Sequence, residues 1–275
     1  MVYPLEVWRL PLQPDPMPTA AANLYDYPRY YDLVFGSDWK AEFDFLLAVF
    51  DKHVPGKVRR LFEPACGTGR LVFRLAQAGY QVSGLDLNPR AVEYCNRRLI
   101  RHNLPASVFV GDMSDFRLPR KVDAAFNTIN SFRHLLSQRA ARSHLRCVAD
   151  SLRKGGIYVL GLHLTPTEGS PLDEERWSAR RGHLAINTHL KTFDLDLRQR
   201  TERCRMLMDI YTPTQTRRIE DELIFRTYTA PQLRRLLADV PELELIATYD
   251  FRYQLDAPTE IAADTQDVVL ILQRS

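Results

Sequence analysis

A short segment containing two glycines, placed after an apolar run, is the clearest candidate for binding chemistry in this 275-residue chain. Its residues are Glu63-Pro64-Ala65-Cys66-Gly67-Thr68-Gly69-Arg70. Gly67 and Gly69 can adopt backbone angles that other residues avoid, and they carry no Cβ that would hold a ligand away from the backbone. A helical pattern follows, and the positive N-terminal end of that helix favours an anionic group. The segment therefore predicts a tight turn whose backbone contacts a small ligand.

Two well-known nucleotide-binding turns fit this segment poorly. A P-loop needs Lys-Ser or Lys-Thr after its glycines to hold phosphate and magnesium, and neither pair follows Gly69. A dinucleotide fingerprint needs a third glycine for close helix packing, and Val72 occupies that position. A Rossmann oxidoreductase is therefore retained only as a less favoured alternative.

The same segment resembles the first motif of the class I S-adenosylmethionine-dependent methyltransferases, in which small residues alternate after an acidic residue. Glu63, Ala65, Gly67 and Gly69 match that spacing, and Ala65 stands where the family usually has glycine. The resemblance implies that the turn wraps the methionine part of S-adenosylmethionine, with the helix start facing its carboxylate. The cofactor-binding residues implied here are Glu63, Ala65, Cys66, Gly67, Thr68, Gly69 and Arg70.

Polar residues follow the next three strand candidates, at the places where such a fold needs them. The resemblance assigns Asp86 to the ribose hydroxyls, with Leu87 beside it in the cofactor site. Asp112 and Met113 resemble the segment that contacts adenine, and Asn127 is expected near the transferable methyl group. Asp after a strand is often only a turn or cap residue. Four matches in the right order and spacing favour the functional interpretation.

The two catalytic candidates, Tyr31 and His134, lie outside these strand ends. Methyl transfer needs an aligned nucleophile and the removal of a proton, for which His134 is the candidate base. The segment ending at His134 resembles sugar amine N-methyltransferases. Tyr30 and Tyr31 resemble a segment that folds over the cofactor in small-molecule methyltransferases, where an aromatic face attracts the sulfonium cation. In the alternative interpretation, His134 packs against or caps the next helix and the tyrosines pack a lid.

Alternating strand and helix patterns from Val58 to Leu164 predict an α/β, Rossmann-like class I methyltransferase fold with helices on both faces of the sheet. A strand at 157–162 is the fifth of a mostly parallel sheet. Strands at 243–249 and 268–272 complete seven, and the resemblance implies that the last runs antiparallel beside the fifth. Thr229 begins a capping box for the helix that precedes the sixth strand.

Two other helix ends are predicted from single residues. Ser37 or Asp38 is expected to cap the helix that precedes the first strand of the sheet. Ser137 is expected to cap a helix that runs through Leu152 and is stopped by Gly155-Gly156.

The predicted domain organisation is an extended Pro-rich arm at 1–22 and a methyltransferase domain at 23–275. Apolar and polar residues alternate within about 165–228, which predicts antiparallel strands inserted into that domain. Such strands lie near the ligand-binding rim of an open α/β sheet. They are expected to wall the acceptor pocket, to form a homodimer surface, or both.

The composition is typical of a soluble globular protein, with 45% hydrophobic residues and a net charge of +3. This charge is too small to indicate a nucleic-acid partner. No stretch approaches the roughly eighteen apolar residues that span a bilayer, so no membrane partner is expected. The four cysteines form no CxxC pair and have no His at zinc spacing, which predicts reduced thiols in a cytoplasmic protein and no metal. Cys66 is interpreted as a small residue chosen for fit rather than as a nucleophile.

The sequence therefore predicts a cytoplasmic enzyme that transfers a methyl group from S-adenosylmethionine to a nitrogen or oxygen atom of a small-molecule acceptor, releasing S-adenosylhomocysteine. The chain after Asn127 lacks the Pro-Pro-aromatic motif of amine-modifying DNA methyltransferases, which disfavours a flipped base as substrate. A cofactor-binding protein without turnover and an RNA methyltransferase are the remaining alternatives.

Overall fold

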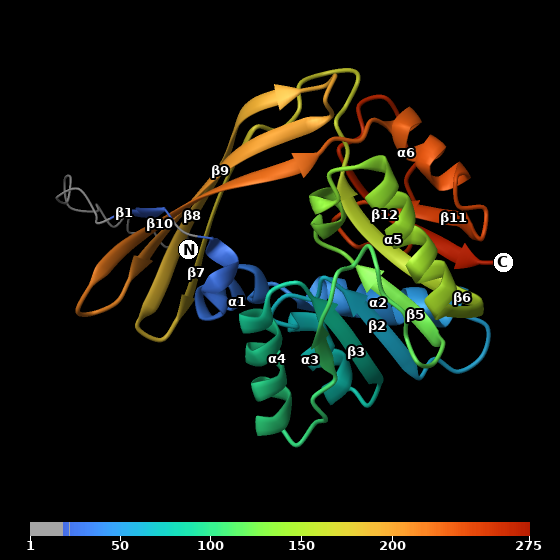
Figure 1. The fold of residues 1–275 in the computed structure, drawn as a ribbon, viewed down its shortest axis with the longest axis horizontal. Helices are drawn as coiled ribbons and strands as arrows, with labels where there is room; N and C mark the ends of the chain where they lie inside the picture. The colour runs from blue at the N-terminus through green and yellow to red at the C-terminus, as the bar shows by residue number, and fades with distance from the viewer. Residues whose placement is uncertain (1–18, 22) are drawn as a thin grey trace, which may run out of the picture.

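A computed structural model describes residues 19–21 and 23–275 and contains two β-sheets (Figure 1). The larger sheet has seven strands in the order β11-β12-β6-β5-β2-β3-β4. Its strands are β2 (Arg60–Pro64), β3 (Gln81–Asp86), β4 (Val108–Val110), β5 (Val122–Asn127), β6 (Leu152–His163), β11 (Leu243–Tyr249) and β12 (Asp267–Arg274). The five strands β2 to β6 pair in parallel, whereas β12 lies antiparallel between β6 and β11. The predicted seven-stranded, mostly parallel sheet with an antiparallel last strand is confirmed.

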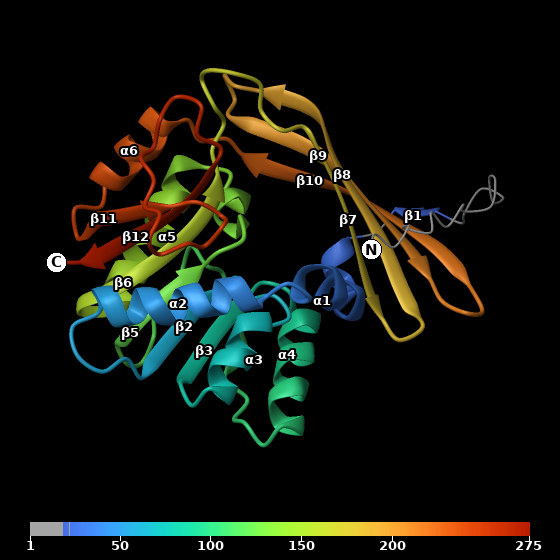
Figure 2. The ribbon, with the colours of Figure 1, turned by 180° about the vertical axis from the view of Figure 1, so that it is seen from behind.

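Helices cover both faces of this sheet, as a comparison of Figures 1 and 2 shows. They are α2 (Lys40–His53), α3 (Arg70–Gln77), α4 (Pro89–Arg101), α5 (Gln138–Ser151) and α6 (Ala230–Ala238). Leu46 of α2, Val72 of α3 and Cys95 of α4 belong to one buried cluster. Leu145 of α5 and Leu236 of α6 belong to a second cluster on the other face. The amphipathic faces of these helices therefore close two cores around the sheet.

The predicted cap of α2 is wrong. Trp39 is the residue before the helix, and it makes no capping hydrogen bond through its side chain. Its indole instead packs against Phe43 and lies under the guanidinium of Arg74. Tertiary packing therefore decides where this helix begins.

The predicted start of α5 is correct, but its predicted end is not. The Ser137 side chain accepts a hydrogen bond from the Ala140 N–H at 3.0 Å, as expected for a cap. The helix ends at Ser151 because Leu152 is already buried and pairs with β5 as the first residue of β6. Gly155 therefore lies inside a strand, and its φ of +72° accompanies an irregularity there rather than a helix end.

A second sheet of five strands extends away from the first, in the order β1-β10-β9-β8-β7 (Figure 1). Its strands are β1 (Thr19–Ala21), β7 (Glu174–Arg181), β8 (Leu184–Asp196), β9 (Thr201–Tyr211) and β10 (Thr216–Arg226). Strands β7 to β10 pair antiparallel and lie within the segment where the sequence predicts inserted strands. Of the predicted arm, residues 19–21 pair in parallel with β10, and residues 1–18 and 22 lie outside the described residues.

One face of the five-stranded sheet is covered by segments that precede α2 in the chain. These are the short helix η1 (Leu24–Asp26) and the helix α1 (Pro28–Gly36). Leu24 and Leu33 are buried there against Met206 and Met208 of β9. A further short helix, η2 (Ser131–His134), contacts β10 from the side of the larger sheet. The tyrosine-rich segment is therefore held between the two sheets.

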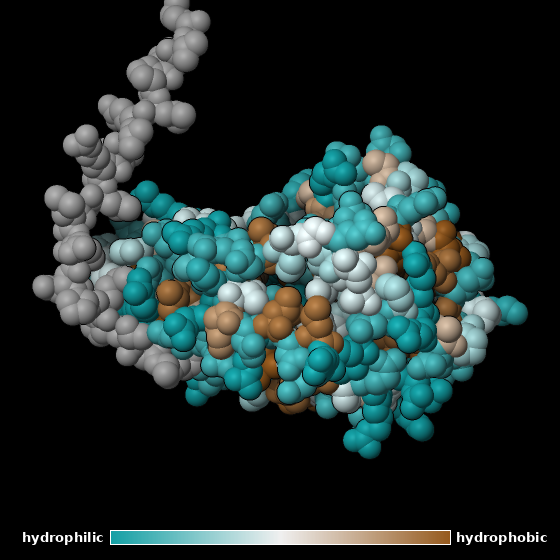
Figure 3. All heavy atoms as spheres, turned by 90° about the horizontal axis from the view of Figure 1, so that it is seen from above, coloured by the Kyte–Doolittle hydropathy of each residue, from teal (hydrophilic) through white to brown (hydrophobic). Residues whose placement is uncertain are grey.

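The surface seen in Figure 3 is mostly hydrophilic, with apolar side chains in separate groups. Within residues 19–21 and 23–275, no helix combines the length and apolar character that crossing a membrane requires. The same residues contain no group of three or more His, Cys, Asp or Glu side chains placed to hold a metal ion.

Candidate functional site

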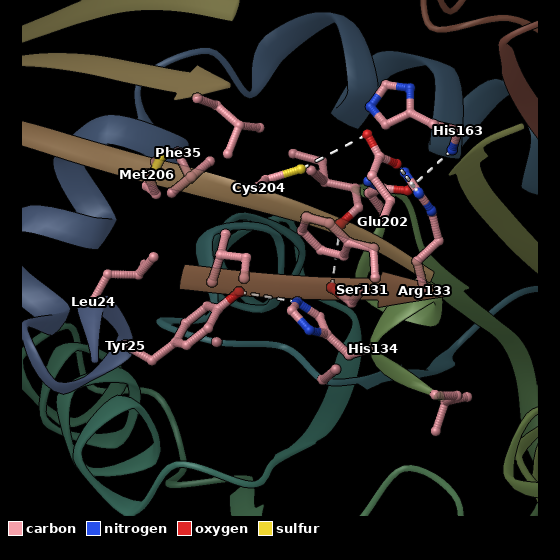
Figure 4. Close-up of a pocket in the computed structure, with 18 of the residues that line it drawn as sticks. Leu24, Tyr25, Phe35, Ser131, Arg133, His134, His163, Glu202, Cys204 and Met206 are labelled. Atoms are coloured by element: carbon pink, nitrogen blue, oxygen red, sulfur yellow. Dashed lines mark hydrogen bonds and ion pairs between the residues drawn. The ribbon is translucent and has the colours of Figure 1, made fainter. Parts of the chain in front are cut away.

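A cavity of about 1330 Å³ lies between the carboxyl ends of the parallel strands and the inner face of the five-stranded sheet. Ligand pockets commonly measure roughly 300–1,000 Å³, so this cavity has room for a cofactor and an acceptor together. Figure 4 shows its lining near η1, η2 and β9. The cavity thus lies at the sheet edge where open α/β folds bind ligands.

The turn after β2 contributes one wall, and its backbone is left-handed at alternate residues. The φ angles are +53° at Ala65, +53° at Gly67 and +67° at Gly69. The Gly67 N–H donates a hydrogen bond to Asp86 Oδ2 at 2.7 Å, and the Asn88 N–H donates to Asp86 Oδ1 at 2.8 Å. Because each carboxylate oxygen has two lone pairs, both oxygens of Asp86 can still accept one hydroxyl. The turn therefore orients Asp86 without using its full hydrogen-bonding capacity.

The two glycines of the turn serve different purposes. A Cβ on Gly69 would lie 2.1 Å from Cys95 Sγ, so this glycine permits close packing of the turn on α4. A Cβ on Gly67 would lie 3.4 Å from Cε1 of the Tyr31 ring, on the cavity side. Cys66 packs against Gly84 of β3, and burial raises the pKa of its thiol well above the usual value. Only Gly67 of these residues faces the space for a ligand.

Charged residues behind the turn form a buried pair. Arg70 binds Glu42 through two parallel hydrogen bonds, one of them at 2.6 Å. Glu63 lies next to this pair and is 6% exposed, and its Oε2 has no hydrogen-bond partner among the described residues. Burial raises the pKa of Glu63, while the positive charge of Arg70 acts in the opposite direction. Both predicted residues, Glu63 and Arg70, therefore support the turn from behind.

The segment after β4 is positioned by a histidine that the sequence argument missed. His144 of α5 is fully buried, and its Nδ1 lies 2.8 Å from the Met113 carbonyl oxygen. Burial lowers the pKa of His144 to about 4, so the imidazole is neutral at pH 7. Since a carbonyl only accepts, Nδ1 carries the proton and Nε2 accepts from the Tyr158 hydroxyl at 2.8 Å. The sequence predicted the helix that carries His144, but no role was assigned to His144 itself.

Asn127 connects two strand ends rather than facing the cavity. Its Nδ2 donates a hydrogen bond to the Pro64 carbonyl at 2.7 Å. The side chain is 2% exposed, and its Oδ1 has no partner among the described residues. The bond fixes the end of β5 to the start of the turn.

Opposite the turn, two aromatic residues and a histidine form the second wall. The Tyr25 and Tyr31 ring centroids lie 5.5 Å apart, and the Tyr25 hydroxyl lies 3.0 Å from His134 Nε2 (Figure 4). Burial, with a smaller contribution from the positive charge of Arg133, lowers the pKa of His134 to about 4. Burial also raises the pKa values of Tyr25 and Tyr31. All three side chains are therefore uncharged at pH 7, and Tyr25 was not predicted.

The structure thus separates the predicted site residues into two groups. Those that line the cavity are Tyr31, Ala65, Gly67, Thr68, Asp86, Leu87, Asp112, Met113 and His134. Those that lie outside its described lining are Tyr30, Glu63, Cys66, Gly69, Arg70 and Asn127. Tyr30 stacks on Tyr27 at 6.1 Å between ring centroids. The second group packs around the segments that carry the first.

Part of this chain is similar to known methyltransferases. Residues 62–156 match the family model described as "Methyltransferase domain". The chain is 33% identical over 133 residues to dTDP-3-amino-3,6-dideoxy-alpha-D-glucopyranose N,N-dimethyltransferase from Streptomyces fradiae, a match that covers 47% of this chain and 50% of that protein. It is 28% identical over 138 residues to dTDP-3-amino-3,4,6-trideoxy-alpha-D-glucopyranose N,N-dimethyltransferase from Streptomyces venezuelae, covering 49% and 56%. The matches span about half the length of these curated relatives.

A solved structure shows the same fold over nearly the whole chain. The sugar N-methyltransferase KedS8 from a Streptoalloteichus species superposes with a TM-score of 0.70 at 20% identity, covering 98% of this chain and 99% of that one. Such low identity shows the fold alone. Residues 62–156 therefore match a methyltransferase domain, and the chain has the fold of a sugar N-methyltransferase.

Proposed function

We propose that this protein transfers a methyl group from S-adenosylmethionine to an amino nitrogen of a small-molecule acceptor, with an amino sugar as the acceptor. The observation that carries the proposal is one cavity with two different walls. The turn and the carboxylates of Asp86 and Asp112 form one wall, and the Tyr25–His134 pair lies on the other. The sugar N,N-dimethyltransferases among the relatives support an amino sugar.

The residues present fit the cofactor. The free lone pairs of Asp86 suit two ribose hydroxyls, and Asp112 offers a carboxylate to the adenine amino group. Backbone N–H groups at the start of α3 suit a carboxylate, and Tyr31 offers an aromatic face to a sulfonium. When bound, S-adenosylmethionine supplies the electrophilic methyl group and a neutral thioether leaving group.

His134 acts in this proposal as an orienting group. An effective general base has a pKa near the working pH, and a histidine with a pKa of about 4 holds a proton too weakly for that role. The neutral imidazole and the Tyr25 hydroxyl instead hydrogen-bond the acceptor, while the surrounding apolar side chains exclude water. The acceptor amine reacts in its neutral form, and the proton leaves the product ammonium for solvent.

The test measures methyl gain by mass spectrometry with S-adenosylmethionine and 3-amino-3,6-dideoxyglucose derivatives. His134→Ala should lower turnover at least about tenfold with unchanged cofactor affinity, because it removes an orienting contact. Asp86→Ala should weaken cofactor binding by about 1–3 kcal/mol, because two charge-assisted hydrogen bonds are lost. Full activity of His134→Ala would remove His134 from the mechanism. Cofactor binding without turnover on any amine would instead favour a binding protein.

We further propose that the protein acts in the cytoplasm and associates in pairs through the inserted strands. All four cysteines are free thiols, which suits a reducing compartment. Phe193 and Leu197 at the end of β8 are 48% and 57% exposed. Light scattering should give the mass of two chains, and Phe193→Lys with Leu197→Lys should reduce it to one. A single-chain mass for the unaltered protein would contradict the pairing.

A further inference from the structure

Almost all of the charged side chains that line the cavity proposed for both ligands are acidic. Nine carboxylates and one guanidinium line it in the described part of the chain. The acidic residues are Asp38, Glu42, Asp86, Asp112, Asp173, Glu174, Glu175, Glu202 and Asp267. Asp86 and Asp112 belong to the proposed cofactor wall, and Glu42 and Glu174 are already paired, with Arg70 and with Arg176 and Lys191. The acceptor side is left with Asp38, Asp173, Glu175 and Asp267, besides the Glu202–Arg133 pair.

The single guanidinium, that of Arg133, is already paired inside the protein. It binds Glu202 Oε2 (Figure 4). Its Nε donates a hydrogen bond to the Arg226 carbonyl at 2.9 Å. The other Glu202 oxygen accepts from the Thr192 hydroxyl at 2.6 Å. The Arg133 side chain is only 6% exposed. Arg133 therefore has little positive charge to offer an anionic ligand.

The arginines of the inserted strands do not compensate, because strand alternation turns many of them to the opposite face. In β9, Cys204 and Met206 line the cavity, whereas Arg203 and Arg205 alternate with them. Arg205 pairs with Glu220 of β10 at 3.1 Å on that outer face. The basic side chains on this outer face are therefore separated from the cavity by the sheet.

The rim of the cavity adds negative charge that is only partly balanced. Asp173 lies in the loop before β7, and Glu175 lies near the start of that strand. Neither carboxylate has an ion-pair partner among the described residues. Asp267 lies 2.6 Å from the His163 imidazole. A cationic amine approaching the rim would be attracted, and a phosphate would be repelled.

The interior beyond this rim is apolar. Leu24, Phe35, Trp177, Met206 and Phe225 line it from α1, η1 and the inner face of the five-stranded sheet. Figure 4 shows Leu24, Phe35 and Met206 on the same side of the cavity, away from the Arg133–Glu202 pair. A wall of this kind buries apolar ligand surface.

We infer that the acceptor is an amine that carries no phosphate and has a substantial apolar portion, such as an amino sugar attached to an apolar group. The inference rests on the proposed function and narrows its substrate class. The two curated relatives are named for dTDP-linked amino sugars. A diphosphate placed in this cavity would meet several carboxylates and no unpaired cationic side chain of its described lining, so its desolvation would not be offset.

Calorimetry of the full chain loaded with S-adenosylhomocysteine tests this directly. The probes are dTDP-3-amino-3,6-dideoxyglucose and the octyl glycoside of the same amino sugar, which share the reacting amine. The octyl glycoside should bind at least about 100-fold more tightly, because it adds apolar burial and removes charge repulsion. Tighter binding of the dTDP sugar, or no difference between the two probes, overturns the inference.

Charge variants separate the rim from the rest of the surface. The double variant Asp173→Asn with Glu175→Gln should weaken binding of the octyl glycoside by roughly a few-fold. It should strengthen binding of the dTDP sugar by a similar factor. Glu220→Gln on the outer face of β10 is the matched control and should change neither. An equal response of the rim variant and the control contradicts the inference.

Turnover of the same probes distinguishes the two proposals. If the octyl glycoside binds more tightly but neither probe is methylated, the proposed function is contradicted and the inferred substrate class is not. Methyl transfer to the dTDP sugar with an equal or higher kcat/KM contradicts the substrate class alone.

Discussion

At the scale of single residues, Ala65 is the clearest departure from what the turn requires. Its φ of +53° lies in the left-handed region, where a Cβ is strained and glycine is not. The resemblance had already identified Ala65 as the position where the family usually has glycine. The backbone of Ala65 is therefore strained, and this strain lies in the wall proposed to hold the cofactor.

Ala65→Gly should stabilise the protein by about 0.5–1 kcal/mol, because relief of backbone strain exceeds the entropy that glycine adds to the unfolded chain. Urea unfolding measures the change. Ala78→Gly is the control, since Ala78 ends α3 with a φ of −77° and should lose stability instead. Destabilisation by both substitutions would show that Ala65 is not strained.

Residue identities near the site were predictable where the signal was local. Asp86 and Asn88 follow a strand and precede a helix, and the structure places both in the turn network. Tyr25 and His144 were missed because their roles depend on partners far away in the chain. The need for Gly69 was assigned to a ligand, whereas the neighbouring Cys95 accounts for it.

At the scale of elements, one buried carboxylate joins three segments around the turn. Asp32 of α1 is 2% exposed and binds Arg98 of α4 at 2.8 Å and Arg181 of β7 at 3.4 Å. Arg98 also donates a hydrogen bond to the Thr68 carbonyl. The helix that carries Tyr31 is thereby tied to both the turn and the second sheet.

Asp32→Asn should cost roughly 3 kcal/mol of unfolding free energy, because Arg98, which is only 20% exposed, loses its buried counter-charge. It should also weaken S-adenosylmethionine binding, since Thr68 and Tyr31 lose a common anchor. The control is Asp44→Asn, which breaks an exposed pair with Lys40 and should cost less than about 0.5 kcal/mol. Equal losses in urea unfolding would contradict the anchoring role of Asp32.

Element ends were predictable when the cap was made by nearby residues. Ser137 caps α5, and Thr229 with Gln232 forms the capping box of α6. The ends set by long-range packing, at Trp39 and Leu152, were not. The residues near a helix end do not indicate which distant strand or aromatic side chain will pack there and determine where the helix ends.

At the scale of the whole molecule, two buried neutral histidines predict how stability depends on pH. Burial lowers the pKa values of His134 and His144 from 6.5 to about 4. In the unfolded chain these groups take up protons below pH 6.5, and in the folded protein only near pH 4. Each therefore contributes stability that is lost as the pH falls through this window.

Urea unfolding between pH 7 and pH 4.5 should show this loss, with a slope near about 1.4 kcal/mol per pH unit for a fully neutral His144. The raised pKa values of Glu63 and Asp86 act in the opposite direction, so the comparison with His144→Gln isolates the histidine. His183→Gln in the exposed β7–β8 turn is the control. An unchanged slope in His144→Gln would contradict a neutral, buried His144.

The order of strands and helices was predictable for the larger sheet because each unit has its own periodicity and its own caps. The position of the inserted strands was not, since alternation predicts strands but not the surface that they face. The sequence was compatible with inserted strands that form a pocket wall, a dimer surface, or both. The structure places Trp177, Met206 and Phe225 on the cavity, and no sequence pattern could choose that face.

The central claim is that the turn at Gly67 holds S-adenosylmethionine, and calorimetric titration of two matched variants tests it most directly. Gly67 and Gly182 have similar φ angles of +53° and +59°, but Gly182 has open space around it in the β7–β8 turn. Valine should strain both turns equally, while only Gly67→Val places atoms in the cavity. We expect Gly67→Val to weaken S-adenosylmethionine binding at least about 100-fold and Gly182→Val to leave it within about twofold. Unchanged affinity of a folded Gly67→Val protein would contradict the claim.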